Sequence, residues 1–123
     1  MSYYPRTMAG NDRCLFCRIA NNELTAKKVY EDADVVAFED INPQAPTHVL
    51  IIPRKHIPSL DELTDADAAT VGIVLVRAAK LARDLHLSDG YRVVINTGDN
   101  AGQTVFHIHA HVMGGRSLGW PPG

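Results

Sequence analysis

An alternating run of apolar residues and histidines near the carboxyl end constrains the fold of this chain most strongly. In residues 105–112 every second side chain points to the same face of an extended backbone, because the side-chain period of a strand is two. One face is apolar throughout: Phe106, Ile108, Ala110 and Val112. The other face carries three histidines: His107, His109 and His111. We therefore predict a strand at 105–112 that packs its apolar face on a helix and turns its histidines outward together.

A helix that suits this face is marked between residues 64 and 87. Thr64 offers a capping hydroxyl and Asp67 a carboxylate three residues later, which is a typical pattern at a helix amino terminus. An apolar stripe at helical spacing follows: Val71, Leu75, Ala78, Ala82 and Leu85. Gly90 can adopt the left-handed conformation that closes a helix. We predict one long helix on one face of a sheet and a ligand surface on the other face.

Four further runs of strand length are rich in β-branched and aromatic residues, at 28–31, 35–38, 48–52 and 91–95. The first two form a hairpin in this interpretation, and 48–52 is a central strand that Pro53 ends. Helical spacing at 14–20 predicts a short helix before them. The predicted fold class is α+β: a mostly antiparallel sheet with one long helix and a short amino-terminal helix.

The length and net charge of the chain exclude some classes of binding partner. A chain of 123 residues suits one domain, and its formal net charge of −2 lacks the basic field of a nucleic-acid-binding protein. The longest apolar run, 71–76, is too short to cross a bilayer, and residues 1–10 have no apolar signal region. We expect a cytoplasmic protein that binds a small ligand, with neither a nucleic-acid nor a membrane partner.

Two kinds of chemistry suit three histidines on one face. Neutral imidazoles can bind zinc, and they can also act as nucleophile and acid in group transfer. The loop at 96–104 favours the second interpretation, because its two glycines, amides and hydroxyls suit a phosphate group. The pair Cys14 and Cys17 indicates half of a zinc site or a redox pair.

The run 107–113 resembles the His-x-His-x-His-x-x signature of the histidine triad (HIT) superfamily. The blocks 37–48, 51–57, 90–92 and 114–123 resemble its Hint branch in particular. The resemblance implies a single HIT-like domain over 1–123, with 1–11 as a flexible lead. It also implies a homodimer whose sheets join, with the tail 114–123 near the partner.

The resemblance implies a purine nucleoside phosphoramidase, which splits the P–N bond of a nucleoside 5′-phosphoramidate through a nucleotidyl-histidine. His109 matches the nucleophile, with His107 and His111 as flanking triad members and His48 as a fourth histidine. Purine contacts match Leu15, Phe16, Ile19 and Phe38, and ribose contacts match Asp40 with Ile41 beside it. Phosphate contacts match Asn96, Gly102, Gln103, Thr104 and Val105. Trp120 of the tail is expected to shape substrate choice across the dimer, and catalysis needs no metal.

Other interpretations stay open on the sequence alone. Typical Hint proteins lack the Cys14 and Cys17 pair, whereas other branches hold a structural zinc with such a pair and histidines at positions like His48 and His107. The alternative for the cysteines is two reduced, partly buried thiols. The alternatives for function are a dinucleoside polyphosphate hydrolase, or a nucleotide-binding or protein-interaction module with weak turnover.

Overall fold

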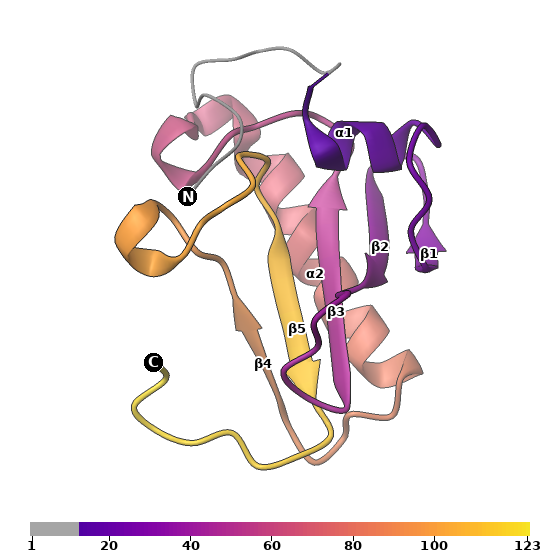
Figure 1. Ribbon diagram of the computed structural model, residues 1–123, viewed down its shortest axis with the longest axis vertical. Coiled ribbons are helices and arrows are strands. Elements are labelled where there is room, and N and C mark those ends of the chain that lie inside the picture. Colours follow the sequence, from indigo (N-terminus) through magenta and orange to yellow (C-terminus); the bar gives the residue numbers. More distant parts are fainter. Residues whose placement is uncertain (1–12) are drawn as a thin grey trace.

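A computed structural model describes residues 13–123 as a five-stranded sheet with a helix on each face (Figure 1). Its strands are β1 (Lys28–Glu31), β2 (Val35–Glu39), β3 (Thr47–Pro53), β4 (Tyr91–Val94) and β5 (Ala110–Gly114). They lie in the order β1-β2-β3-β5-β4, and every neighbouring pair is antiparallel. The helices are α1 (Leu15–Ala20) and α2 (Ala68–Asp84), with short 3₁₀ turns at Leu60–Glu62, Asp65–Asp67 and Asp99–Ala101. The predicted α+β class is confirmed, and the predicted lead at 1–11 lies outside the described residues.

Both faces of the central strands are buried, each under a different helix. Alternate residues of β2 and β3 turn to α2 and form one apolar core with it: Val35, Ala37, Val49, Ile51, Val74, Ala78, Leu81 and Ala82. The intervening residues pack against α1 in a second core: Val36, Phe38, Leu50, Ile52, Phe16, Cys17 and Ile19. The period-two geometry of a strand accounts for this division. The α1 face is also the face on which His48 and His111 lie, so α1 covers only part of the histidine side of the sheet.

Helix α2 begins as predicted, and its buried face includes the predicted Ala78 and Ala82 but not Leu75. The Asp67 carboxylate accepts a hydrogen bond from the Thr64 backbone N–H at 3.0 Å, which completes the expected capping pair. The predicted core position Leu75 is 46% exposed, whereas Val74 is buried against the sheet. The prediction for Leu75 is wrong because two apolar stripes run along this helix, and spacing alone does not decide which of them meets the sheet.

The carboxyl end of α2 closes earlier than Gly90. His86 has a left-handed backbone (φ 62°), and its N–H donates to the Arg83 carbonyl at 3.1 Å. The N–H of Leu87 donates to the Ala82 carbonyl at 2.9 Å, which completes a Schellman motif. Gly90 also has a positive φ, of 128°, but it turns the chain into β4.

The predicted strand at 105–112 is the main error, since β5 begins only at Ala110. Three backbone carbonyls, from the last residue of β3 and the segment after it, hold the segment before β5 in place of strand pairing. The Pro53 oxygen accepts from Nε2–H of His107 at 2.7 Å, and the Ile57 oxygen accepts from the Ile108 N–H at 2.7 Å. The Pro58 oxygen accepts from the Gln103 side-chain amide at 2.8 Å. The histidines consequently do not face outward together: His107 is fully buried and His109 is 8% exposed.

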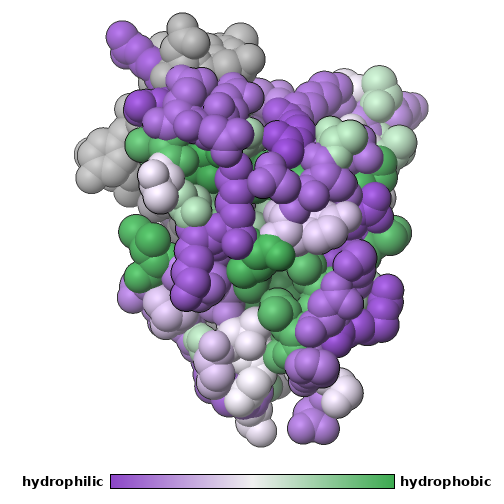
Figure 2. Space-filling model, turned by 90° about the vertical axis from the view of Figure 1, so that its right-hand side faces the viewer, coloured by the Kyte–Doolittle hydropathy of each residue, from purple (hydrophilic) through white to green (hydrophobic). Residues whose placement is uncertain are grey.

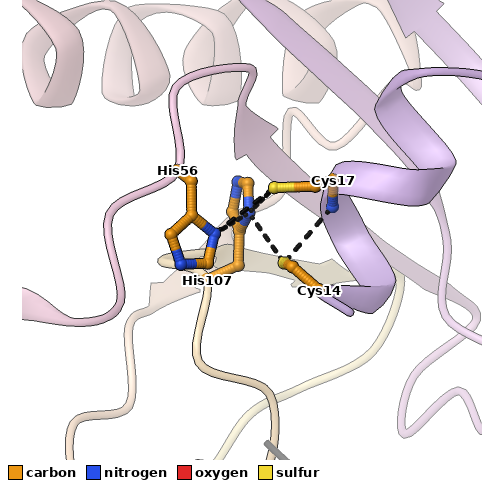
Figure 3. A group of neighbouring side chains, drawn as sticks. All are labelled: Cys14, Cys17, His56 and His107. Carbon is orange, nitrogen blue, oxygen red and sulfur yellow. Dashed lines mark hydrogen bonds between the residues drawn. The ribbon is translucent and has the colours of Figure 1, made fainter. Parts of the chain in front are cut away.

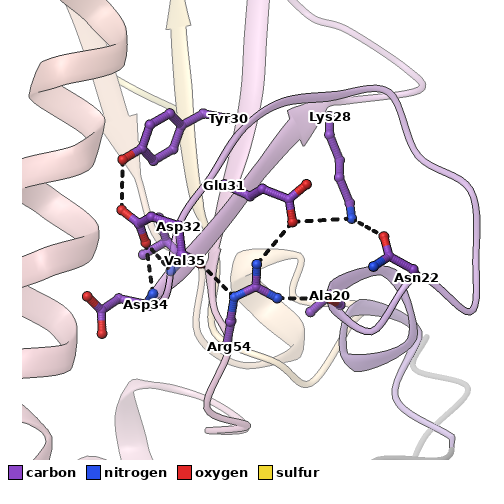
Figure 4. A network of polar contacts seen from close by, with 9 residues as sticks. All are labelled: Ala20, Asn22, Lys28, Tyr30, Glu31, Asp32, Asp34, Val35 and Arg54. Atoms are coloured by element: carbon purple, nitrogen blue, oxygen red, sulfur yellow. Dashed lines mark hydrogen bonds and ion pairs between the residues drawn. The ribbon is translucent and has the colours of Figure 1, made fainter.

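Arg54 fixes the position of α1 relative to the β1–β2 hairpin (Figure 4). Its guanidinium donates to the Ala20 carbonyl at the end of α1 (3.0 Å) and to the Asp32 carbonyl in the hairpin turn (2.8 Å). A third bond reaches the Glu31 carboxylate at 3.0 Å. Arg54 directly follows β3, so one planar side chain joins three segments that are distant in sequence.

The two edges of the sheet differ in character. Edge strand β1 carries Lys28 and Glu31, and Figure 2 shows this side of the molecule with hydrophobic surface near its middle, framed by hydrophilic side chains. Edge strand β4 ends in Val93 and Val94 and lies on the opposite side of the sheet. Among the described residues, no helix is long and apolar enough to cross a membrane.

Candidate active site

His109 lines a cavity, and a hydrogen bond fixes one nitrogen of its ring. Its Nδ1 lies 2.8 Å from the carbonyl oxygen of His107, and because a carbonyl only accepts, the ring proton sits on Nδ1. The lone pair of the neutral ring is consequently on Nε2. Burial lowers the pKa of His109, against the opposing effects of that hydrogen bond and the Asp40 charge, so the ring is neutral near pH 7. The ring of Phe16 meets His109 edge to face at 5.0 Å. His109 therefore has the tautomer that a nucleophile with a free Nε2 requires.

A second pair of histidines forms a fixed hydrogen-bonded chain beside it. The backbone N–H of Gln44 donates to Nδ1 of His48 at 3.0 Å, so the proton of the neutral His48 ring is on Nε2. That Nε2–H donates to Nδ1 of His111 at 2.9 Å. His111 in turn carries its proton on Nε2, on a ring that lines the cavity. The chain thus ends in an N–H donor at the wall of the cavity.

Charges around His111 set its protonation. Burial, followed by the neighbouring His109 and His48, lowers the pKa of His111 to about 4, while the Asp40 carboxylate opposes this shift. One Asp40 oxygen lies 3.4 Å from Nε2 of His48 and 4.0 Å from Nδ1 of His111. The other oxygen accepts from the Asn42 N–H at 2.8 Å. Without a ligand, His111 is neutral near pH 7.

The cavity has a volume of about 600 Å³ and brings together many of the predicted nucleotide contacts. Those that line it are Leu15, Phe16, Ile19, Phe38, Asp40, Ile41, Thr104 and Val105, together with His109 and His111. Phe16 and Phe38 meet edge to face at 5.4 Å and form an aromatic wall. Sequence reasoning missed the rim residues Leu24, Thr25, Ala26, Lys27 and Glu39. Glu39 follows Phe38 and pairs with Lys27 at 3.3 Å, so extending the predicted hairpin by one residue at each end would have found these two.

The remaining loop residues lie outside that lining. Gln103 is buried, and its side chain bonds within the protein: the oxygen accepts from the Gly98 N–H at 3.0 Å and the amide donates to Pro58 and Val105 carbonyls. Gly102 ends the Asp99–Ala101 turn with a φ of 85°, a conformation that favours glycine. Gln103 thus holds the loop to the segment after β3. Asn96 and Gly102 border the same loop, and Trp120 is 83% exposed in the carboxyl tail.

A separate cluster of four side chains converges behind the cavity (Figure 3). Cys14 and Cys17 come from the start of α1, His56 from the segment after β3, and His107 from the segment before β5. Nδ1 of His107 lies 3.3 Å from the Cys14 sulfur, 3.4 Å from the Cys17 sulfur and 3.3 Å from Nδ1 of His56. Cys17 Sγ lies 3.3 Å from Nδ1 of His56, and all four atoms fall within 4.8 Å of one another.

This cluster fits a metal ion in both spacing and chemistry. Ligand atoms of a tetrahedral zinc lie roughly 3.3–3.8 Å apart, given bonds of about 2.0–2.3 Å. Nε2–H of His107 donates to the Pro53 carbonyl, which leaves the Nδ1 lone pair aimed at the cluster, as expected of a metal-binding histidine. Burial, together with the hydrogen bond and charge of Cys14, raises the pKa of Cys17 to about 12. A cation would reverse that preference and stabilise both thiolates.

The predicted fourth ligand, His48, is wrong. Its ring nitrogens engage Gln44 and His111, and it belongs to the cavity, whereas His56 completes the cluster. His56 lies three residues beyond Pro53, where the chain leaves the sheet, so no strand periodicity marked it. The structure also places the ring of His107 in this cluster, and only its carbonyl oxygen reaches His109.

Known proteins resemble this chain in both sequence and structure. The sequence matches the HIT domain family over residues 21–118. An uncharacterized HIT-like protein from Synechocystis is 50% identical over 109 residues, which cover 89% of this chain and 96% of that protein. The crystal structure of a HIT family hydrolase from Legionella pneumophila Philadelphia 1 superposes with a TM-score of 0.89 at 51% identity, covering 90% of this chain and all of that one. A histidine triad nucleotide-binding protein from Candida albicans gives a TM-score of 0.74 at 35% identity, with 88% and 82% coverage. The chain belongs to the HIT domain family.

Proposed function

We propose that the protein is a purine nucleoside phosphoramidase, which hydrolyses the P–N bond of nucleoside 5′-phosphoramidates. The observation that carries this proposal is the pairing of two fixed tautomers at one cavity. His109 offers a lone pair on Nε2, and His111 offers an N–H donor at the cavity wall. A nucleophile beside a proton donor is what amine displacement at phosphorus requires. The similar proteins from Legionella pneumophila, a HIT family hydrolase, and from Candida albicans, a histidine triad nucleotide-binding protein, support such an activity.

The cavity suits a purine nucleotide with its phosphate toward His109. Phe16 and Phe38 give an aromatic wall, and Leu15 and Ile19 add apolar surface for a base of either purine type. Asp40 is the carboxylate for the ribose hydroxyls in this proposal, with Ile41 beside it. Thr104 and Val105 lie next to the histidines and serve the phosphate, while Asn96, Gly102 and Gln103 shape the loop that carries them.

The proposed reaction has two displacements. Nε2 of His109 attacks the α-phosphorus, the P–N bond breaks, and the departing amine keeps the bonding pair and takes a proton from His111. Water then attacks the phosphorus of the nucleotidyl-histidine and gives a proton to His111, and His109 leaves with its electron pair. A bound phosphoryl anion stabilises the imidazolium of His111 and so raises the pKa of this residue before the proton is needed. In that state Nδ1 of His111 also carries a proton, which displaces the hydrogen bond from His48 and faces the Asp40 carboxylate 4.0 Å away.

Turnover of adenosine 5′-phosphoramidate by the wild-type protein and by His109→Ala tests the proposal. We expect release of AMP and ammonia by the wild type and a loss of at least about 10³-fold in kcat for the variant. Faster turnover of diadenosine polyphosphates than of phosphoramidates would favour the dinucleotide hydrolase instead. AMP binding by both proteins without turnover by either would favour a nucleotide-binding module.

We also propose that two chains join along β4. This edge strand carries no acidic residue and exposes Tyr91, whereas edge strand β1 bears charges that oppose pairing. Val76 of α2 is 59% exposed, so the single chain also leaves this apolar side chain in contact with solvent. Arg92 of β4 holds the tail through the Gly119 carbonyl at 2.7 Å, so Trp120 lies beside the edge that a partner would cover. Light scattering should give twice the chain mass, and a monomer at micromolar concentration would contradict this proposal.

Finally, we propose that zinc occupies the cluster of Cys14, Cys17, His56 and His107. Two thiolates and two neutral imidazoles form a closed tetrahedral set, which is typical of structural zinc. Zinc would fix these four side chains and take no part in the displacement. Elemental analysis of tag-free protein should give one zinc per chain, and a value near zero after growth with added zinc would contradict it.

A further inference from the structure

The metal cluster and the nucleophile share a residue, which gives the first link between them. His107 places its ring in the cluster, and its own carbonyl oxygen accepts the Nδ1–H of His109 at 2.8 Å. That carbonyl holds the proton on Nδ1 of His109 and so keeps Nε2 free. Segment 105–109 lies outside the sheet, so no strand pairing holds this carbonyl in place.

A second link runs through the fourth ligand. His56 directly precedes Ile57, whose carbonyl accepts the N–H of Ile108 at 2.7 Å. Ile108 lies between His107 and His109 in the chain. The rings of His56 and His107 also meet at 5.1 Å, nearly perpendicular. A contact between the two rings and a backbone hydrogen bond thus hold the segment that carries His109 against the segment that carries His56.

A third link reaches the wall of the cavity. Phe16 lies between the two cysteine ligands in sequence, and its ring contacts His109 at 5.0 Å and His107 at 6.1 Å. The Cys17 N–H donates to the Cys14 sulfur at 3.3 Å, so the first turn of α1 fixes the position of the Cys14 side chain relative to Cys17. A metal that draws Cys14 and Cys17 to His107 consequently seats Phe16 against the nucleophile.

We infer that metal bound by Cys14, Cys17, His56 and His107 positions the nucleophile His109, with His56 as a positioning residue that acts through His107 and never touches the substrate. This inference rests on the proposed function and on the proposed zinc. Loss of the metal releases the His107 carbonyl and α1 together. His109 then samples both tautomers, and the aromatic wall moves away from it.

The test compares tag-free wild type, His56→Ala, the conservative His56→Cys, and His86→Asn as a control histidine on the far end of α2. His56→Cys offers a Cys₃His set, which also binds zinc. Zinc content, the ring ¹⁵N shifts of His109 by NMR, AMP affinity by calorimetry, and kcat are measured on each. We expect His56→Ala to lose zinc, to lose the Nδ1–H tautomer signature and to lower kcat about 10²-fold. AMP affinity should fall with it, His56→Cys should restore all four properties, and His86→Asn should match the wild type.

Two results would overturn the inference: a metal-free wild type, or a His56→Ala protein that lacks zinc and keeps both the His109 tautomer and kcat. If His56→Ala does not fold, wild-type protein is stripped with a chelator and reloaded with zinc, and the same ¹⁵N shifts decide. If phosphoramidate turnover is absent while the tautomer and AMP affinity still follow the metal, the proposed function fails and the inference stands.

Discussion

Nε2 of His48 lies 2.9 Å from Nδ1 of His111, and the Gln44 backbone N–H fixes the direction of this hydrogen bond. Because a backbone N–H can only donate, the contact of the Gln44 N–H with Nδ1 leaves His48 to donate from Nε2. His111 accepts on one nitrogen and presents its N–H to the cavity with the other. A backbone amide in the loop before β3 therefore sets the orientation of a proton donor on β5.

His48→Ala should slow the release of poor leaving groups most. The variant removes the side chain that orients the His111 ring, so fewer molecules present the Nε2–H of this ring to the departing amine. We expect kcat to fall about 10- to 100-fold for adenosine phosphoramidates of alkyl amines, which need a proton to leave. Phosphoramidates of weakly basic aryl amines provide the internal comparison and should slow much less. Equal slowing of both series would contradict the role of His48.

Nucleotide binding should take up protons near pH 7. The pKa of His111 is about 4 without ligand, and the groups that face it are His48 on β3, Asp40 after β2, and His109. A bound phosphate anion raises this pKa, so a fraction of the molecules gains a proton on binding AMP. Calorimetry in buffers of different ionisation enthalpy measures that fraction, and uptake should grow as pH falls from 8 toward 6. Proton release over this range would be inconsistent with the expected shift.

Phe16→Leu should weaken AMP binding about tenfold and leave the fold intact. Leucine keeps most of the apolar volume but removes the ring that packs against the purine base in this proposal, and an aromatic pair of that kind contributes about 0.5–1.5 kcal/mol. Phe106→Leu is the matched control, because Phe106 is buried but does not line the cavity. An equal loss of affinity in both variants would show that packing in general, rather than the aromatic wall, supports binding.

Asp32→Asn should destabilise the protein at neutral pH and progressively less as the pH falls below 4. Burial raises the pKa of Asp32, but the Arg77 hydrogen bond at 2.7 Å and two turn amides outweigh it and hold this pKa well below 3.8. The carboxylate therefore stabilises the fold above about pH 4, and this contribution disappears as pH falls through its native pKa. Because the pair is partly exposed, we expect about 1 kcal/mol at pH 7 in urea unfolding. Asp84→Asn, in the exposed Lys80 pair, should cost less, and a cost for Asp32→Asn that does not decrease between pH 5 and pH 2 would contradict the assignment.

Local patterns predicted most of the elements of the fold. The hairpin, the central strand, the short amino-terminal helix and the long helix all lie where periodicity and capping residues indicated them. The start of β5 could not be predicted, because residues 105–109 alternate as a strand does. His107 and Ile108 donate instead to the carbonyls of Pro53 and Ile57, and the nearby Gln103 donates to that of Pro58. These carbonyls belong to a segment about fifty residues earlier in the chain, and no local pattern records such pairing.

The candidate site divides in the same way. The resemblance to the histidine triad superfamily assigned the apolar residues of 15–19 and the histidine run to a nucleotide pocket, and many of those residues line a cavity. The metal cluster could be predicted only in part, since Cys14 and Cys17 share a helical turn but His56 arrives from an irregular segment. His48 and His56 are the same type of residue, so residue type does not distinguish them. Only their contacts in the folded chain assign His48 to the cavity and His56 to the cysteines.

The most direct test of the central claim is to trap the covalent intermediate. Wild-type protein is mixed with adenosine 5′-phosphoramidate, quenched within milliseconds, digested at neutral pH and analysed by mass spectrometry. We predict one adenylyl group per active site, carried by His109, that forms and decays at rates sufficient to account for kcat. Turnover without an adduct on His109, or an adduct on another residue that forms as fast in His109→Ala, would contradict the account.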